Sequence, residues 1–569
     1  MTNPKATPSQ KIDTSLYLNR WVAIVRERVI GVGQTRAQAE RAAKQIRPKD
    51  RPLLLYVDSG GNLTDAPPQA SRPADWFTTH PLLRQVAEVL QRHQIEAYLV
   101  GGAVRDFLLN RRPVMDLDFA LPGDGLKAAR QVADALNASY YPLDIERKTG
   151  RVVCDAPSGD RAVRFHLDFA ALRGRDLAAD LADRDFTINA IALSLLPDPR
   201  LIDPLGGQQD LQAQRIAAAA PTAFRRDPVR AIRAVRQAVA FGFTITPETR
   251  RLIADAAALL PLVSSERQRD ELMKLLNTPR PGSAVSLLHQ LGVLLYLVPE
   301  AAAMAGVPQS PPHHLDVLRH TTLAMDTWAE MARHNWLDAP PELRLPLNDY
   351  FDALPAGEFT LRELMPLALL LHDTGKPITH SLDTADDSQV RHRFINHEQR
   401  SAGIARKFCK RFHFSNQAQD FVEAVVRQHM RPLQLSTGDP PGRRAIFRYF
   451  RDCQAGRFSA GPAVALHALA DHRATYPPGE GQPQESALLA VAHRLLAAYF
   501  REQEQVVDPP PLLSGRDLID EFGLKPGRLI GVLLGRLKEA QAVGQVQTRA
   551  EALTFVQNDP DLMRHLAEN

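Results

Sequence analysis

The chain has 569 residues, of which 44% are hydrophobic and 24% are charged, so it is long enough for several globular domains with sizeable cores. The formal net charge of +4 is small for this length, so any binding of nucleic acid depends on local basic patches and not on a global positive field. The three cysteines are scattered, and there is no apolar run of about twenty residues, the length that a membrane helix needs; a cytoplasmic chain without a membrane partner is therefore expected.

The N-terminal region contains a small unit followed by a linker. Two strand-like runs in WVAIVRERVIGVGQT, a helix over RAQAERAAKQI and a strand over PLLLYV predict a ββαβ unit, and we assign residues 1–60 to this accessory domain. The next segment is rich in Gly, Pro, Ser and Asp, which predicts a linker over 61–77.

The remaining sequence divides into an α/β part and a helical part. Residues 78–220 combine an amphipathic helix with strand patterns in EAYLVGG and VMDLDFAL, which predicts a mixed α/β head with an antiparallel-rich sheet. The body that follows is almost wholly helical, and we expect a neck over 221–304, a histidine-rich domain over 305–480 and a helical tail over 481–569. The predicted fold class is therefore α+β, with a small head, a long all-α body and the N-terminal unit.

Two aspartates on the second of these head strands predict a metal site. Asp116 and Asp118 are two residues apart, so both carboxylates project from the same face of a strand. Like charges this close repel each other unless a cation lies between them, and Mg²⁺ takes carboxylate oxygens together with substrate phosphates. A solvent-facing β-hairpin also explains Asp-x-Asp alone, but the neighbouring residues favour the metal site.

The residues around this aspartate pair fit a nucleoside triphosphate. Gly101 and Gly102 precede an expected helix, so backbone N–H groups and the helix N-terminus can approach a phosphate, and Arg105 adds a cationic donor. Asp168 lies in another alternating run, RFHLDFAALRG. It offers the third carboxylate that two-metal phosphoryl transfer usually needs, although an aspartate at a strand end without such a role is an equal alternative.

A polar stripe on a later helix predicts base selection. Asp227, Arg230, Arg233 and Arg236 recur at three-residue steps and share one slowly drifting face. Cytosine and adenine present an exocyclic amine beside a ring acceptor, whereas uracil and guanine present a carbonyl beside an N–H. One Asp and one Arg side by side therefore fit C and A, and an unpaired buried polar group penalises U and G. A solvated amphipathic helix is the alternative interpretation.

Five motifs in order give a family resemblance. They are GGAVRD with DLD, DLADRDFTINAIA (180–192), DPLGGQQDL (203–211), RRDPVRAIRAVR (225–236) and SSERQRDELMKLL (264–276). This series resembles the class II tRNA nucleotidyltransferases and bacterial poly(A) polymerases of the polymerase β superfamily. The resemblance implies addition of C, C and A to a tRNA 3′ end from CTP and ATP, with Mg²⁺ held by the catalytic aspartates.

The same resemblance implies roles for residues distant from the aspartate pair. The family residues matching Asp227 and Arg230 select the base, and those matching Arg184, Arg233 and Arg236 face the nucleotide. Residues near 513–556 resemble the family's C-terminal segment, which implies shape-based recognition of the tRNA acceptor arm.

Two features of the chain bear on the product. The family usually has Glu-Asp where this chain has Arg226-Asp227, so the support of the base-selecting helix and the choice between C and A stay open. Residues 140–159 fall where the family keeps a flexible loop that helps to switch specificity.

The histidine-rich domain predicts a second metal site. Its imidazoles and carboxylates are His320, His372, Asp373, His397, His429 and Asp471. Such ligands from several helices suit Mn²⁺, Fe, Ni²⁺ or Zn²⁺ better than Mg²⁺ alone. The pattern resembles the HD superfamily of metal-dependent phosphohydrolases, which implies His320, His372, Asp373 and Asp471 as core ligands and the other two histidines as second-metal positions.

The remaining polar residues of this domain have simpler interpretations. Lys376 is a candidate phosphate contact, whereas His313, His314, His392 and His472 are expected to be structural.

Three functions follow from these interpretations. The first is a template-independent RNA 3′-end nucleotidyltransferase that adds CCA to tRNA, with CC-adding, A-adding or poly(A)-synthesising variants open. The second is an HD phosphohydrolase whose head only binds RNA, and the third is a non-catalytic RNA scaffold. No particular oligomeric state is predicted.

Overall fold

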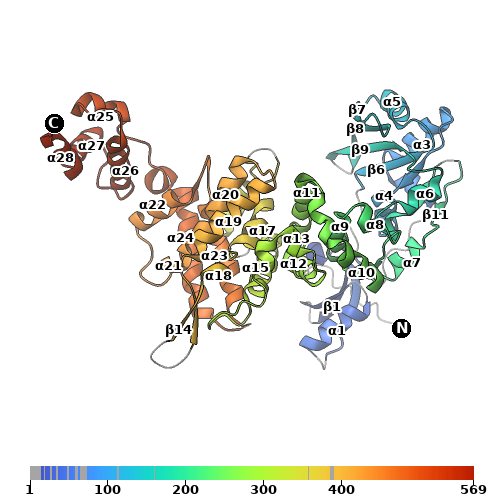
Figure 1. Cartoon of the computed structure of the whole chain (residues 1–569), viewed down its shortest axis with the longest axis horizontal. Helices are drawn as coiled ribbons and strands as arrows, with labels where there is room; N and C mark the ends of the chain where they lie inside the picture. The colour runs from blue at the N-terminus through green and yellow to red at the C-terminus, as the bar shows by residue number, and fades with distance from the viewer. Residues whose placement is uncertain are drawn as a thin grey trace, which may run out of the picture. The chain divides into compact units, whose positions relative to one another are not determined.

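The computed structural model forms two compact units, Met1–Arg230 with Phe241–Leu252 and Ala231–Ala240 with Ile253–Asn569 (Figure 1). The structure describes residues 14–568 except 18–19, 26–27, 34–35, 48–49, 58–61, 65–72, 112–113, 159–160, 196, 337, 356–357, 385–389 and 478. In this described part, no helix has the length and apolar character needed to cross a membrane.

The first unit begins with a small antiparallel sheet covered by one helix. The strand order is β2-β1-β3-β4, and the elements are β1 (Arg20–Val25), β2 (Arg28–Gly33), α1 (Arg36–Ile46), β3 (Leu53–Val57) and β4 (Leu63–Thr64). Alternation along β1 sends Ala23 toward α1 and Val22 toward the opposite core. The stretch predicted as a linker contains β4 and the start of α2 (Pro73–Thr79), while its residues 65–72 lie outside the described part.

A seven-stranded sheet forms the head in the same unit. The strand order is β11-β10-β5-β6-β9-β8-β7, and every neighbouring pair is antiparallel except β6 and β9. Its strands are β5 (Tyr98–Val100), β6 (Asp116–Leu121), β7 (Ser139–Asp144), β8 (Thr149–Ser158), β9 (Arg161–Ala171), β10 (Ala192–Ser194) and β11 (Leu201–Ile202). Residues 140–159, predicted to match a flexible loop, form most of the β7–β8 hairpin up to Ser158, and residue 159 lies outside the described part.

Short helices surround this sheet and connect its strands. They are α3 (Leu83–Arg92), α4 (Gly102–Leu108), α5 (Gly125–Leu136), α6 (Leu177–Ala182), η2 (Thr187–Asn189), α7 (Gly207–Gln212) and α8 (Ala223–Arg226). Helix α5 packs on β8 and β9. Its backbone comes so close to β9 that a Cβ on Gly125 would lie 2.5 Å from the Phe169 carbonyl oxygen. The short strands β12 (Arg215–Ile216) and β13 (Thr244–Ile245) pair in parallel.

The second unit is a stack of helices. Its longer members are α11 (Ser265–Leu276), α12 (Pro281–Gln290), α15 (Val317–Arg333), α16 (Arg344–Phe351), α17 (Leu361–Leu371), α19 (His397–Arg411), α20 (Asn416–Gln428), α22 (Arg443–Asp452), α23 (Gly461–Thr475) and α24 (Gln482–Arg501). Between them lie η3 (Ala257–Leu262), α13 (Leu294–Leu297), α14 (Pro299–Ala302), η4 (Pro341–Leu343), α18 (Lys376–Thr379), β14 (His380–Thr384), β15 (Val390–Phe394), α21 (Arg431–Leu435), β16 (Gln454–Ala455), β17 (Phe458–Ser459) and η5 (Gln503–Val507).

Helix α23 lies at the centre of this stack and is buried on almost every face, as expected for a helix without a polar stripe. It packs against α15 and α24, and α17 packs against α20. The tail comprises α25 (Gly515–Phe522), α26 (Arg528–Ala542), α27 (Arg549–Gln557) and α28 (Pro560–Glu568), with a core that includes Leu518, Leu533 and Leu537. The two units share α9 (Arg230–Phe241) and α10 (Pro247–Ala256). The predicted α+β class, with its antiparallel-rich head sheet and helical body, is confirmed, although the body also holds the short hairpins β14–β15 and β16–β17.

Candidate active site and metal centre

The register of β6 and β9 brings the three predicted catalytic aspartates together. In this parallel pair Asp118 lies opposite Asp168, and Asp116 lies opposite His166. Leu117, between the two aspartates of β6, and Phe119, after them, are buried, so the apolar residues fill the core while both carboxylates project from the other face. A sequence pattern of period two thus becomes a cluster of acids on adjacent strands.

The electrostatics of this cluster suit a divalent cation. Surrounding protein atoms, and then the Asp168 and Asp116 carboxylates, raise the pKa of Asp118, while Arg184 opposes the shift. The carboxylate still reaches solvent, so it is crowded by negative charge and remains accessible. A cation between these acids would relieve the repulsion, so the residues present fit a metal.

Two neighbours of the aspartates carry no sequence signal that marks them in advance. Arg151 on β8 lies opposite Asp168, and its Nε and Nη2 atoms each donate a hydrogen bond of 2.7 Å to one of the two carboxylate oxygens. His166 Nδ1 lies 3.0 Å from an Asp116 oxygen. Both partners are contributed by strand register, which cannot be inferred from the spacing of the motifs.

The conformation of Gly101 is compatible with the prediction that the backbone comes close to the bound phosphates at this position. Its φ of 75° lies in the left-handed region, and it caps α4 at the end of β5. A Cβ there would lie 3.0 Å from an Arg184 guanidinium nitrogen and 3.4 Å from an Asp118 oxygen. A side chain at this position would therefore be strained and would crowd the catalytic carboxylate. Gly102 follows as the first residue of α4.

Arg105, predicted to contact the triphosphate, has several partners within the head. Its guanidinium donates to both Asp106 oxygens at 2.9 Å and to the Asn189 side-chain oxygen at 2.7 Å, and it lies 4.6 Å from the centre of the Phe241 ring. Asn189 in turn donates to Asp185. In this structure Arg105 joins α4 to η2, and its contact with a triphosphate stays a prediction.

Two of the predicted base-selecting residues, Asp227 and Arg230, lie next to the ends of α6 and α8. Arg230 is 8% exposed, and its guanidinium donates to the carbonyl oxygens of Asp183 and Arg184 at 2.8 and 3.1 Å. Its Nε lies 3.9 Å from an Asp227 oxygen. Arg184 donates to Asp180. The structure therefore brings Asp227, Arg230 and Arg184 into one connected cluster.

The two later arginines of the stripe are ion-paired in the second unit. Arg233 and Arg236 donate to the two oxygens of Glu271 on α11, at 3.1 and 3.0 Å. Burial favours a neutral Glu271, but the two arginines outweigh it and lower the pKa of its carboxyl. Glu271 belongs to the fifth motif, whose spacing indicates no partner for it.

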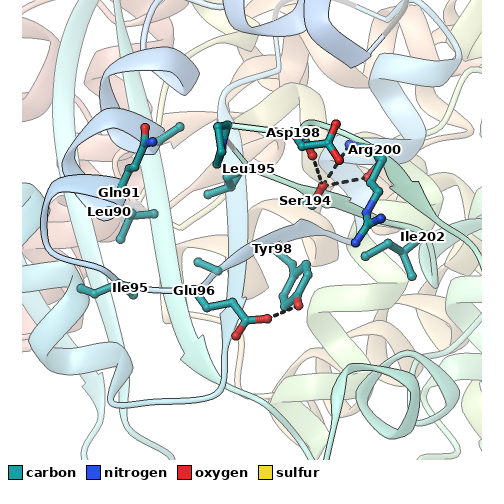
Figure 2. A pocket seen from close by; sticks show the side chains of 13 residues that line it. Leu90, Gln91, Ile95, Glu96, Tyr98, Ser194, Leu195, Asp198, Arg200 and Ile202 are labelled. Atoms are coloured by element: carbon teal, nitrogen blue, oxygen red, sulfur yellow. Dashed lines mark hydrogen bonds between the residues drawn. The ribbon is translucent and has the colours of Figure 1, made fainter.

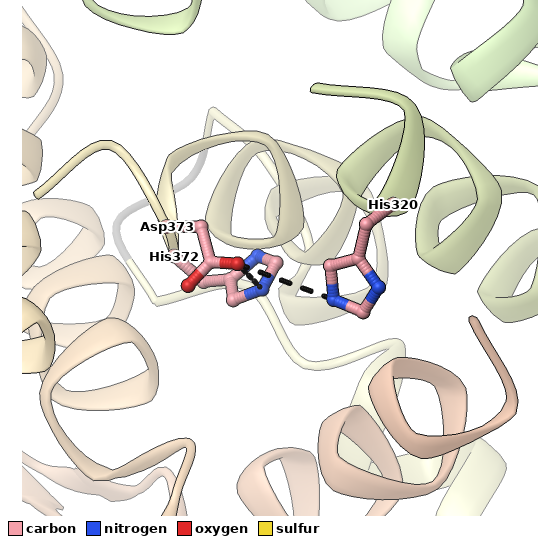
Figure 3. Close-up of side chains that lie close together, drawn as sticks. All are labelled: His320, His372 and Asp373. Atoms are coloured by element: carbon pink, nitrogen blue, oxygen red, sulfur yellow. Dashed lines mark ion pairs between the residues drawn. The ribbon is translucent and has the colours of Figure 1, made fainter. Parts of the chain in front are cut away.

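The predicted metal ligands of the second unit converge from five segments. His320 lies on α15, His372 and Asp373 follow α17, and Asp471 lies on α23. His320 Nε2 is 2.8 Å and His372 Nε2 is 3.2 Å from the same Asp471 oxygen, and His372 Nε2 is 3.2 Å from an Asp373 oxygen. Figure 3 shows His320, His372 and Asp373 directed toward one another.

Two more histidines extend the cluster on the other side of Asp373. His397 begins α19 and His429 follows α20. His397 Nε2 lies 3.4 Å from an Asp373 oxygen and 3.3 Å from His429 Nε2. Asp373 therefore faces both halves, as a ligand shared by two metals would.

The tautomers of these histidines favour metal binding. His372, His397 and His429 each donate Nδ1–H to the carbonyl oxygen three residues earlier, at 2.7, 2.9 and 2.8 Å. Each Nε2 then points into the cluster and is the atom left for a metal; at His372 a cation would take the place of the proton that Asp373 and Asp471 hold on this nitrogen. Facing acceptors repel one another until a cation lies between them, so the donor set fits a metal.

The cluster is also rich in buried charge. Burial lowers the pKa of a histidine, yet Asp373 and Asp471 outweigh it and raise the pKa of His372 to about 10. The same pairing, with Lys376 2.7 Å from Asp373, holds the pKa of Asp373 well below its usual range. Gln309 accepts from Lys376 at 2.7 Å, a partner that no motif marks.

A further buried histidine escaped the sequence analysis. His467 lies one turn before Asp471 on α23, with ring centres 5.0 Å from His372 and 5.6 Å from His429. Neither of its ring nitrogens makes a hydrogen bond with a described residue, and burial lowers its pKa to about 3. A lone histidine in the apolar pattern of α23 carried no signal for this position.

A hollow elsewhere in the head has no comparable chemistry. It has a volume of about 250 Å³ and lies between α3 and the β5–β10–β11 edge of the sheet (Figure 2). Tyr98 donates to Glu96 there, and the Ser194 hydroxyl donates to the Asp198 carbonyl oxygen at 2.8 Å. These polar groups are paired with one another, which leaves the aspartate cluster as the candidate active site of the head.

Replacing Asp118 by asparagine is expected to stabilise the metal-free protein at pH 7. The raised pKa of Asp118 means that the folded state holds this charge unfavourably, a cost present above the folded pKa and absent below the ordinary pKa of an aspartate. A gain in the free energy of unfolding appears as a higher Tm. Thermal melts of both proteins in a chelator should show a gain at pH 7 that disappears near pH 4; an equal or lower Tm at pH 7 would contradict the assignment.

Three family descriptions match the chain in order. They are "Poly A polymerase head domain" over residues 97–217, "Probable RNA and SrmB- binding site of polymerase A" over 242–304 and "HD domain" over 320–498. Their limits enclose the aspartate cluster in the first match and all the histidine ligands in the third.

Curated relatives align with most of the chain. An A-adding tRNA nucleotidyltransferase from Deinococcus radiodurans is 35% identical over 81% of this chain and 95% of its own length. A CC-adding tRNA nucleotidyltransferase from Thermus thermophilus is 32% identical over 81% and 93%. A multifunctional CCA protein from Halorhodospira halophila is 34% identical over 60% and 76%.

Solved structures share the fold. The structure of a CCA-adding enzyme with ATP superposes with a TM-score of 0.55 at 20% identity, covering 86% of this chain and 96% of the other. The same type of enzyme with CTP gives a TM-score of 0.54 at 19% identity, with coverage of 86% and 98%.

Proposed function

The chain belongs to the tRNA nucleotidyltransferase and poly(A) polymerase family, and we propose that it adds C and A to the 3′ end of tRNA from CTP and ATP without a nucleic-acid template. Complete CCA addition is the product we favour, because one Asp–Arg pair fits both bases. The relatives named above that add only A or only CC support a partial product as the alternative, as does Arg226 in place of the family's Glu. tRNA as substrate implies a cytoplasmic enzyme.

The register of Asp118 opposite Asp168 carries this proposal. We assign Asp116 and Asp118 to two Mg²⁺ ions, which would neutralise the triphosphate and the charge that develops during transfer. Asp168, oriented by its two hydrogen bonds from Arg151, is the carboxylate we assign to activation of the RNA 3′-hydroxyl. Gly101 leaves room beside Asp118 for the phosphates.

Asp227 and Arg230 are the residues we assign to base selection. Asp227 accepts from the exocyclic amine that C and A share, and Arg230 donates to the neighbouring ring acceptor. Arg230 donates to the carbonyl oxygens of Asp183, Arg184 and Ala223 in the structure, so we infer that it exchanges one of these partners when its guanidinium binds a base. Arg184, Arg233 and Arg236 complete the nucleotide-facing set in this proposal.

The histidine cluster favours a second activity as a metal-dependent phosphohydrolase. We assign His320, His372, Asp373 and Asp471 to one metal and His397 with His429 to a second, with Mn²⁺, Ni²⁺, Fe or Mg²⁺ as the candidate ions. A metal there would lower the pKa of a water molecule for attack on phosphorus. RNA ends that carry a 2′,3′-cyclic phosphate or a 3′-phosphate are the substrates that would suit an enzyme that extends 3′-hydroxyls.

Purified protein given a tRNA without its terminal CCA is expected to incorporate C from CTP, and A once ATP is also present. The pair of bases follows from the Asp–Arg pair, and the assay measures product length with CTP alone, ATP alone or both, in Mg²⁺. Incorporation of C alone, or of A only on a tRNA ending in CC, would identify a partial enzyme. No incorporation on any of these tRNAs would contradict the proposed function.

A further inference from the structure

An ion pair connects the two segments that carry the nucleotide-facing residues of the head. An Arg226 guanidinium nitrogen donates to an Asp183 carboxylate oxygen at 2.7 Å, and an Arg173 nitrogen lies 4.0 Å from the other oxygen. Arg226 directly precedes Asp227 in the chain, and Asp183 directly precedes Arg184. The pair therefore lies one residue away from each side of the proposed base site.

Little regular structure holds Asp227 in place. Helix α8 contains only four residues, and Asp227 follows it with extended dihedrals of −146° and 91°. The direction of its carboxylate thus depends on how the end of α8 is anchored and not on a continuous helix. Side-chain contacts at this junction are the available anchors.

The contacts of Arg230 cross the same junction. Its guanidinium donates to the backbone oxygens of Asp183 and Arg184, so the segment that follows α6 is held by residues on both sides of Asp227. If Arg230 exchanges one of these carbonyls for a base, the Arg226–Asp183 pair keeps the two segments together. The pair supplies an anchor that does not have to leave during nucleotide binding.

We propose that Asp183 and Arg226 are a positioning pair for base selection. Their ion pair fixes Asp227 relative to Arg184, at a position where related enzymes usually carry Glu in place of Arg226. The inference rests on the proposed nucleotidyltransferase function. Both side chains reach solvent, and exposed ion pairs contribute little to folding stability, so the pair acts on the geometry of the site more than on the free energy of unfolding.

Charge reversal tests the pair. Arg226→Glu and Asp183→Arg are each expected to lower kcat/KM for CTP and ATP by about tenfold to 100-fold, because small displacements of a recognition group have effects of that size. Each should also increase incorporation of UTP relative to CTP. The double variant Arg226→Glu with Asp183→Arg should recover most of the rate and of the base preference, since it restores an ion pair of opposite polarity.

A matched control distinguishes position from total charge. Arg225 is the exposed neighbour of Arg226 and makes no ion pair with a described residue, so Arg225→Glu should keep wild-type kinetics. Tm should change little in all variants. Wild-type kinetics in both single reversals, or a double variant no better than the singles, would overturn the inference. Wild-type protein that adds no nucleotide would instead overturn the proposed function.

Discussion

Asp118→Ala is expected to lower kcat/KM for nucleotide addition to tRNA by about 10³-fold or more, which corresponds to ~4 kcal/mol of transition-state stabilisation. Asp118 lies opposite Asp168 and on the same face as Asp116. Its carboxylate borders the space that the missing Cβ of Gly101 leaves open. No neutral side chain supplies an equivalent oxygen ligand for Mg²⁺. Incorporation of labelled CTP and ATP into a tRNA without CCA measures the loss.

Two comparisons make this result specific. Asp155→Ala removes an exposed aspartate of β8 that pairs with Arg164, and it should leave nucleotide addition unchanged. Asp118→Ala should also keep any Mn²⁺- or Ni²⁺-dependent phosphatase activity of the histidine cluster. Nucleotide addition above a tenth of the wild-type rate would refute the assignment of Asp118, and joint loss of both activities would show that the sites are not independent.

His372→Gln is expected to remove metal from the second unit and to lower phosphohydrolase activity by about 100-fold or more. His372 is fully buried, and its Nε2 lies 3.2 Å from both Asp373 and Asp471. Burial of so many ionisable groups is costly unless a cation compensates them, so one lost imidazole weakens the whole site. Metal content per protein and hydrolysis of an RNA 2′,3′-cyclic phosphate measure the effect.

The stability of the metal-loaded protein gives a second measurement. A ligand that binds only the folded state raises its stability, so a chelator should lower the Tm of wild-type protein and change that of His372→Gln little. His334→Gln, at the end of α15, should retain the metal and the chelator effect. Unchanged metal content in His372→Gln would contradict the proposed ligand set, whatever the effect on tRNA addition.

Much of the candidate site depends on residues that are close together in the chain, so it could be predicted from the sequence. Asp116 and Asp118 share a face because a strand has period two, and Arg230, Arg233 and Arg236 recur along α9 because a helix turns every 3.6 residues, whereas Asp227 lies in extended backbone before that helix. The family resemblance drawn from five ordered motifs is confirmed, as are the HD resemblance and the α+β class. These conclusions need only spacing and residue type.

The pairings across the fold were not predictable in the same way. The fold pairs Arg105, the predicted triphosphate contact, with Asp106 and with Asn189, the latter more than eighty residues away. Arg233 and Arg236 share Glu271 on a different helix. A charged side chain takes the partner that packing brings within reach, and short-range periodicity does not state which partner that is.

The sequence by itself determined that this chain carries a nucleotidyltransferase head and an HD domain, because residue types at characteristic spacings mark the motifs of both. The tertiary structure decided how those groups meet. It placed Asp168 in register with Asp118, brought Nε2 of His372 and of His397 within 3.2 and 3.4 Å of the Asp373 carboxylate, and added His467 from α23. Register and helix packing depend on contacts between residues far apart in the chain, and only the folded core fixes those contacts.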